Sequence, residues 1–319
     1  MSRRSVALVA VTAAAACLTL IHVSAQEAVF KAGVELVDVA ATVTDGDGRF
    51  ISGLTKDDFI ISEDGRPQEI VSFSSERVPV SLAMLLDVSS SMTDEQLATA
   101  RLAINHFVYD LLDKEDELLL MEFAGRGRIL QSWTRDRERF DRSLARANAS
   151  PVDPNVAQQP DGTVQPMNWG TAIYDAVATS LGLAAKGTNR KKAVLVISDG
   201  VDTSSRRTIK QVQDAIRASE ILVYALGVDP GSGGIFGSES AVNSKALRKL
   251  TDETGGLTEV VKGFKNLEKA TARLADEFNK QYVFGYAAPT RDGRWHTIKV
   301  EVKKKKGSKV RARAGYIAS

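Results

Sequence analysis

Short apolar runs alternate with segments of helical spacing through the middle of this chain. The apolar runs are Leu82–Leu86, Leu118–Phe123, Arg128–Trp133, Ala193–Ile197, Leu222–Leu226 and Leu257–Val261. Between them, apolar residues recur on one helical face, as at Leu97, Ile104 and Leu111. Strands that alternate with amphipathic helices form βαβ units, which place helices on both faces of a parallel sheet. We therefore predict an α/β fold over residues 81–280, with a doubly wound, mostly parallel, Rossmann-like sheet of six strands.

The segments on both sides of this region have the pattern of β-strands. The apolar stretches are 34–43, 59–61 and 69–71 before it, and 282–286, 297–302 and 310–316 after it. The turn Glu63-Asp64-Gly65-Arg66 predicts a hairpin between 59–61 and 69–71. Each flank has too few strands to bury a sheet face alone, and the ends of an inserted domain usually lie close together. We predict that residues 27–80 and 281–319 pair into one small β-sandwich, into which residues 81–280 are inserted.

The first 25 residues have the composition of an export signal. Arg3 and Arg4 precede an apolar stretch over residues 5–23, and Val23-Ser24-Ala25 offers small residues for cleavage. This predicts a signal peptide over residues 1–25 and a periplasmic, cell-surface or extracellular protein. Two alternatives stay open, namely a retained membrane anchor and lipidation at Cys17. Because Cys17 is the single cysteine, cleavage would leave a protein without disulfides.

The charge balance argues against a nucleic-acid partner. The chain has 42 basic and 40 acidic residues, and loss of the signal removes Arg3 and Arg4 but no acid. A neutral protein lacks the excess positive charge that binds phosphate backbones. With 43% hydrophobic and 26% charged residues, the composition is that of a soluble globular protein.

Oxygen-bearing side chains follow two of the predicted buried strands. Asp87, Ser89 and Ser91 come after one strand, and Asp199 comes after another. Thr171 follows a glycine at the start of a predicted helix. In a doubly wound sheet, ligands lie at the carboxyl ends of the strands, so we expect these five side chains to share one crevice. Carboxylates and hydroxyls suit Mg²⁺ or Mn²⁺, and no Cys or His cluster suits Zn²⁺.

The pattern Asp87-x-Ser89-x-Ser91, with Thr171 and Asp199 at these intervals, resembles the metal-ion-dependent adhesion site of von Willebrand factor type A domains. The resemblance covers about residues 80 to 280. It implies that the three hydroxyls bind the ion directly and the two carboxylates through water. It also implies that an acidic side chain of a protein partner completes the coordination. Ser90 stands where many relatives have Gly, at a position that is not a ligand.

The flanks resemble a bacterial variety of this family described from Acidobacteria, which implies an exported protein of obscure role. The residues that carry this resemblance are Val43-Thr44-Asp45, Gly53-Leu54-Thr55-Lys56-Asp57-Asp58-Phe59, Gln281-Tyr282-Val283-Phe284-Gly285-Tyr286 and Arg313-Ala314-Gly315-Tyr316.

An enzyme is the competing class of function. Haloacid-dehalogenase-type phosphatases place a second acid where this chain has Ser89, so their nucleophile and acid pair is missing. A serine hydrolase needs a histidine near its nucleophile, and His106 and His296 lie outside the predicted crevice. We therefore expect a non-enzymatic adhesion or binding module, with association with the cell envelope and an undetermined oligomeric state. An envelope assembly factor that uses the fold as a scaffold is the alternative, and a metal-dependent hydrolase comes third.

Several features have plainer interpretations. Asp87-x-Ser89-x-Ser91 alone is also the pattern of a helix N-cap. Asp202 is expected to be a loop or capping residue, and Asp175, on the helix after Thr171, either bonds backbone groups or has a functional role. The proline-rich segment 149–168 and the segment 230–237 are expected to be loops that border the site or are simply disordered. The lysines at 303–306 are expected at a solvated hairpin tip.

Overall fold

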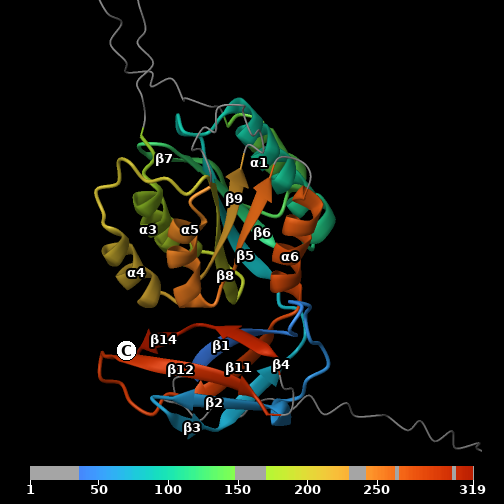
Figure 1. Ribbon diagram of the computed structural model, residues 1–319, viewed down its shortest axis with the longest axis vertical. Helices are drawn as coiled ribbons and strands as arrows, with labels where there is room; N and C mark the ends of the chain where they lie inside the picture. Colours follow the sequence, from blue (N-terminus) through green and yellow to red (C-terminus); the bar gives the residue numbers. More distant parts are fainter. Residues whose placement is uncertain (1–35, 148–169, 230–241, 263–265, 304–306, 319) are drawn as a thin grey trace, which may run out of the picture. The chain divides into compact units, whose positions relative to one another are not determined.

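The computed structural model describes residues 36–147, 170–229, 242–262, 266–303 and 307–318 (Figure 1). The predicted signal peptide and the expected loops at 149–168 and 230–237 lie outside the described residues, as does most of the lysine run. In the part of the chain that is described, no helix has the length and apolar character needed to span a membrane.

A six-stranded sheet forms the centre of the α/β lobe, in the order β10-β9-β8-β5-β6-β7. Its strands are β5 (Val80–Asp87), β6 (Glu117–Phe123), β7 (Gly127–Thr134), β8 (Lys191–Ser198), β9 (Leu222–Asp229) and β10 (Thr258–Lys262). All neighbours are parallel except β6 and β7, which are antiparallel. Every residue of β5 and β6 is buried, because helices cover both faces of the sheet. The prediction of a doubly wound, mostly parallel six-stranded sheet is confirmed.

Helices pack on the two faces of this sheet and create two apolar cores (Figure 1). One core includes Leu97 and Phe278, from α1 and α6, and the other includes Ile173, Val212 and Leu247, from α3, α4 and α5. The helices are α1 (Asp94–His106), α2 (Arg137–Leu144), α3 (Ile173–Ala184), α4 (Ile209–Arg217), α5 (Ser244–Thr251) and α6 (Leu267–Asn279). Short helical turns add η1 (Lys56–Asp58), η2 (Phe107–Leu111) and η3 (Asp252–Thr254).

The two flanks pair into a β-sandwich. One of its sheets has the order β13-β1-β11-β4 and the other β14-β12-β2-β3, so each sheet takes strands from both ends of the chain. The strands are β1 (Leu36–Thr44), β2 (Phe59–Glu63), β3 (Arg66–Gln68), β4 (Ile70–Ser74), β11 (Tyr282–Ala287), β12 (Trp295–Val302), β13 (Lys309–Ala312) and β14 (Gly315–Ile317). Phe59, Ile61 and Phe284 are in the core between them. The predicted pairing of the flanks is confirmed, whereas the exact domain boundaries stay a prediction.

Two details of the sandwich differ from the sequence prediction. The hairpin partner of β2 is β3, with Glu63 opposite Arg66, whereas residues 70 and 71 of the predicted partner 69–71 lie in β4 of the other sheet. Asp64 and Gly65 have φ of 47° and 77°, so they form a two-residue turn that fixes this short register.

Residues 310–316 were predicted to form one final strand. They are divided between two strands, β13 and β14, which belong to different sheets. The chain changes sheet at Arg313 and Ala314, where the Ala314 N–H donates to the backbone carbonyl of Glu253 in η3. A Cβ at Gly315 would lie 2.2 Å from the His296 carbonyl, so the crossing depends on a residue without a side chain.

Candidate functional site

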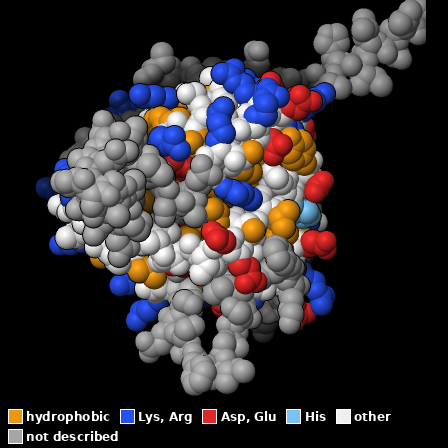
Figure 2. Space-filling view, turned by 90° about the horizontal axis from the view of Figure 1, so that it is seen from above, with side chains coloured by type: hydrophobic (Ala, Val, Ile, Leu, Met, Phe, Trp, Pro, Cys, Tyr) orange, Lys and Arg blue, Asp and Glu red, His pale blue; other side chains and the backbone are white. Residues whose placement is uncertain are grey.

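The predicted site residues converge at the carboxyl edge of the central sheet, the upper edge in Figure 1. Asp87 is the last residue of β5, and Asp199 directly follows β8, the neighbour of β5. Thr171 lies two residues before α3, in line with the prediction that it leads into a helix. Figure 2 looks down on this end of the molecule, where basic and acidic side chains are both exposed.

Three hydroxyl oxygens form a close triangle at this edge. The Thr171 hydroxyl donates to Ser89 Oγ at 2.7 Å, Ser89 Oγ lies 2.9 Å from Ser91 Oγ, and Ser91 Oγ lies 3.2 Å from Thr171 Oγ1. Adjacent ligands of an octahedral ion bound at about 2.1 Å are roughly 3.0 Å apart. The triangle therefore has the size of one face of a Mg²⁺ or Mn²⁺ coordination shell.

The Asp87 carboxylate is fully buried beside this triangle. One oxygen accepts the Ser89 N–H at 2.9 Å, and the other accepts the Ser198 hydroxyl at 2.6 Å. Burial raises the pKa of Asp87 to about 7, and the nearby charge of Asp199 acts in the same direction. A cation would favour the ionised form of this carboxyl, so the buried acid fits a metal site.

Ser198 is a positioning residue that the sequence analysis did not identify. Its hydroxyl accepts the Gly200 N–H at 3.0 Å while it donates to Asp87, so it joins the ends of β5 and β8. Serine as the last residue of a buried strand is the one signal that points to this role. Asp199 itself is 6% exposed, and its carboxylate accepts the Val201 N–H at 3.0 Å.

Thr171 is held by a loop that follows β8. Its N–H donates to Thr203 Oγ1 at 2.9 Å, and its carbonyl accepts the N–H groups of Thr203 and Ser204. A Cβ at Gly170 would lie 2.6 Å from Thr203 Oγ1, which explains the glycine before Thr171. Thr203 and Ser204 carry no sequence signal, because their contact with residue 171 arises only in the folded chain.

Asp202 and Asp175 organise loops near the site. Asp202 accepts the Ser205 hydroxyl at 2.5 Å and the Tyr174 N–H at 3.2 Å. Asp175 accepts the backbone N–H groups of Arg206 and Arg207, and it pairs with the Arg207 side chain at 2.9 Å. The contacts of Asp202 agree with the loop or capping role expected for it, and Asp175 bonds backbone groups, which is one of the two roles left open for it.

The two described histidines have partners away from this edge. His106 Nδ1 lies 2.8 Å from Thr271 Oγ1, between α1 and α6. In the sandwich, His296 lies beside Glu63 and Asp64. These three residues form a cluster that the sequence analysis did not predict, and their ligand atoms are close enough together to hold a metal. His296 Nδ1 is 2.8 Å from Asp64 and its Nε2 is 3.0 Å from Asp292, so both ring nitrogens have carboxylate partners. This is the environment of an imidazolium cation, and carboxylates raise the pKa of His296.

The sequence matches the family described as von Willebrand factor type A domain over residues 81–273, more than half of the chain. No significant match was found among curated proteins.

Solved structures with a similar fold include three bacterial proteins. BatB from Bacteroides thetaiotaomicron is 20% identical, covers 62% of this chain and 98% of its own, and has a TM-score of 0.47. A von Willebrand factor type A protein from Catenulispora acidiphila is 12% identical over 89% of this chain and 75% of its own, with a TM-score of 0.49. The vWF domain of the pilus tip protein Mfa5 from Porphyromonas gingivalis is 13% identical over 63% and 95%, with a TM-score of 0.44. Similarity at this level carries no information on ligands.

Proposed function

Because the chain belongs to the von Willebrand factor type A family, we propose that it is an exported, non-enzymatic binding module that engages an acidic group of a protein partner through a divalent cation. The triangle of hydroxyls beside two carboxylates is the observation that carries this proposal. Ser89, Ser91 and Thr171 would hold Mg²⁺ or Mn²⁺ directly, and Asp87 and Asp199 would act through water.

The charge of the donor set supports a binding role. Three neutral hydroxyls leave most of the positive charge on a bound ion, which then supplies an open position for a carboxylate of the partner. Asp87 is held by Ser89 and Ser198, so its carboxylate is fixed near the site without occupying that open position. Both described histidines lie elsewhere, so the described residues of the site include no general base of the kind a serine hydrolase requires.

Export and membership of a bacterial variety of the family are proposed from the sequence. The signal at residues 1–25 supports export to the periplasm, the cell surface or the medium. The motifs of the flanks support membership of the variety described from Acidobacteria. An intact metal-ion-dependent adhesion site is part of the same proposal.

Manganese binding followed by electron paramagnetic resonance tests the metal step. The parent protein should bind one Mn²⁺ tightly, and Ser89→Ala and Thr171→Val should each weaken that binding strongly. Ser132→Ala, at an exposed position of β7, is the matched control and should bind as the parent does. Equal Mn²⁺ binding by all four proteins would refute the proposed ligand set.

Recognition of an acidic group of the partner is tested with two peptides that are identical except at one position, which is Glu in one and Gln in the other. The Mn²⁺-loaded protein should bind the Glu peptide more tightly, and EDTA should abolish the difference. If the protein still binds the Glu peptide more tightly than the Gln peptide by the same factor in EDTA, the acid is not recognised through the metal.

A further inference from the structure

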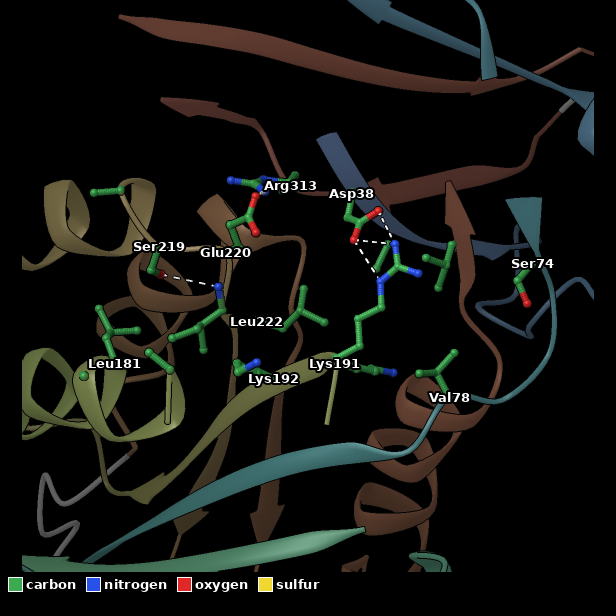
Figure 3. Close-up of a pocket in the computed structure, with 17 residues that line it drawn as sticks. Asp38, Ser74, Val78, Leu181, Lys191, Lys192, Ser219, Glu220, Leu222 and Arg313 are labelled. Atoms are coloured by element: carbon green, nitrogen blue, oxygen red, sulfur yellow. Dashed lines mark hydrogen bonds and ion pairs between the residues drawn. The ribbon is translucent and has the colours of Figure 1, made fainter. Parts of the chain in front are cut away.

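A cavity of about 640 Å³ lies between the α/β lobe and the sandwich, at the amino ends of β8 and β9 (Figure 3). The candidate metal site lies at the opposite, carboxyl end of the same sheet. Cavities of this size typically bind small molecules.

The walls of the cavity are mainly apolar. On the sandwich side, Ala40 of β1 and Val283 of β11 line it, while the alternate residues Val37 and Val39 face the sandwich core. On the α/β side the apolar lining residues include Val78, Leu181, Ala185, Ile221 and Leu222. Such walls favour a ligand with an apolar body.

Two ion pairs join the lobes across the cavity, as Figure 3 shows. Arg190 bonds both carboxylate oxygens of Asp38, at 2.6 and 2.7 Å from Nη2. Arg313 lies 3.4 Å from Glu220. These four charges neutralise one another in pairs, so they leave no net charge for a ligand.

Lys191 and Lys192 also line the cavity, and neither has a carboxylate within ion-pair distance among the described residues. The Lys192 ammonium donates to the Asn189 carbonyl at 3.1 Å, and that of Lys191 to the Phe278 carbonyl at 2.9 Å. Each ammonium retains further hydrogens for other acceptors. The lining therefore has an excess of positive charge.

We propose that this cavity binds a single-chain amphipathic anion, a linear carboxylate whose chain lies against the apolar walls and whose head group lies at Lys192. A carboxylate is an acceptor of opposite charge for the Lys192 ammonium, which has no ion-pair partner among the described residues. A carbon chain covers the apolar residues of the walls. The site lies away from the metal, so its occupancy is independent of the proposed function.

Isothermal titration with dodecanoate at micromolar concentration tests the proposal. Dodecanoate should bind the full-length protein, whereas acetate, which lacks the chain, and dodecyl maltoside, which lacks the charge, should bind far more weakly. Lys192→Ala should weaken dodecanoate binding by about tenfold or more, the effect expected for loss of a charged hydrogen bond. Lys186→Ala, at an exposed position outside the cavity, should have no effect.

Val283→Trp should abolish binding by filling the cavity, and its melting curve shows whether the variant is folded. A Lys191→Met variant gives a second readout. Burial lowers the pKa of Lys191 to about 7 against the opposing effect of Glu277, with smaller contributions from Arg77 and Asp116. An anion favours protonated Lys191, so the parent should bind more tightly at pH 6 than at pH 8, and Lys191→Met should lose that dependence.

Three results would overturn the proposal. They are no dodecanoate binding, equal binding of dodecyl maltoside, and full binding by a folded Val283→Trp protein. Binding in EDTA should equal binding in Mg²⁺, which separates this test from that of the metal site.

Discussion

At the scale of single residues, the candidate site depends on supporting side chains, those of Ser198 and Thr203, as well as on its expected ligands. Asp87, Ser89 and Asp199 were predicted because their positions after buried strands imply a shared edge of the sheet. Ser198 and Thr203 were missed because each acts through a side chain or loop that meets its partner only in three dimensions. Sequence patterns place residues on elements, but they do not specify contacts between loops.

Gly170 provides a prediction at this scale. In Gly170→Ala the new Cβ would lie 2.6 Å from Thr203 Oγ1, so the loop must shift and carry Thr171 with it. We expect weaker Mn²⁺ binding with the fold retained, measured by paramagnetic resonance and circular dichroism. Gly182→Ala is the control, because nothing lies within 4 Å of its Cβ in α3 and alanine favours a helix. Unchanged Mn²⁺ affinity in Gly170→Ala would contradict the role given to this close approach.

His296 provides a prediction about pH. Hydrogen bonds with Asp292 and Asp64 raise its pKa above the ordinary value of 6.5. The imidazolium is therefore favoured in the folded state, and this stabilisation is complete below pH 6.5 and lost as pH rises through the higher pKa of the folded protein. In urea unfolding, the difference in stability between the parent and His296→Gln should shrink from pH 6 to pH 8.5. A difference that is constant over this range would show that the charge of His296 does not matter.

Strands could be predicted from the sequence where their apolar residues follow one regular pattern. Prediction was less successful where the chain passes from one sheet to another. Continuous apolar runs identified β5, β6, β8 and β9, because strands buried on both faces are apolar throughout. The hairpin was assigned a wrong partner because 66–68 is polar and contains Pro67, although an edge strand tolerates proline. The split between β13 and β14 has no periodic signal, since it depends on the contacts of Gly315.

Strand β11 provides a prediction at the scale of elements, because it joins the C-terminal flank to the N-terminal one. Phe284 is fully buried, with its ring centroid 4.7 Å from that of Phe59 and 5.4 Å from that of Phe73. Phe284→Ala should reduce the free energy of unfolding by about 3–5 kcal/mol through lost burial and a cavity. Val71→Ala, at a position 47% exposed, should change it by less than about 0.5 kcal/mol. Similar losses for both variants would contradict the description of the sandwich core.

The molecule as a whole is held together by polar contacts between the lobes as well as by the two chain crossings. Glu277 of α6 is buried and bonds Thr42 of β1 at 2.8 Å and Arg311 of β13. The Arg190 and Asp38 pair is more exposed, with side chains 65% and 37% accessible. Burial should therefore make the Glu277 contacts the stronger link between lobes.

Two variants compare these links. Glu277→Gln should lower the free energy of unfolding by about 1–3 kcal/mol, because it weakens charged hydrogen bonds in a buried place. Asp38→Asn should lower it by less than about 1 kcal/mol, the usual limit for an exposed pair. Denaturant unfolding measures both, and a larger loss for Asp38→Asn would reverse the assignment of the main link.

The measurement that tests the metal site most directly is a thermal melt of the protein, stripped with EDTA and then given Mg²⁺, Mn²⁺ or Ca²⁺. An ion that binds only the folded state stabilises it by about 2.7 kcal/mol at a hundredfold excess over Kd. We predict that Mg²⁺ or Mn²⁺ raises the melting temperature of the parent, and that Asp87→Ala and Ser89→Ala lose the rise. An equal rise in these variants, or none in the parent, would contradict the metal site.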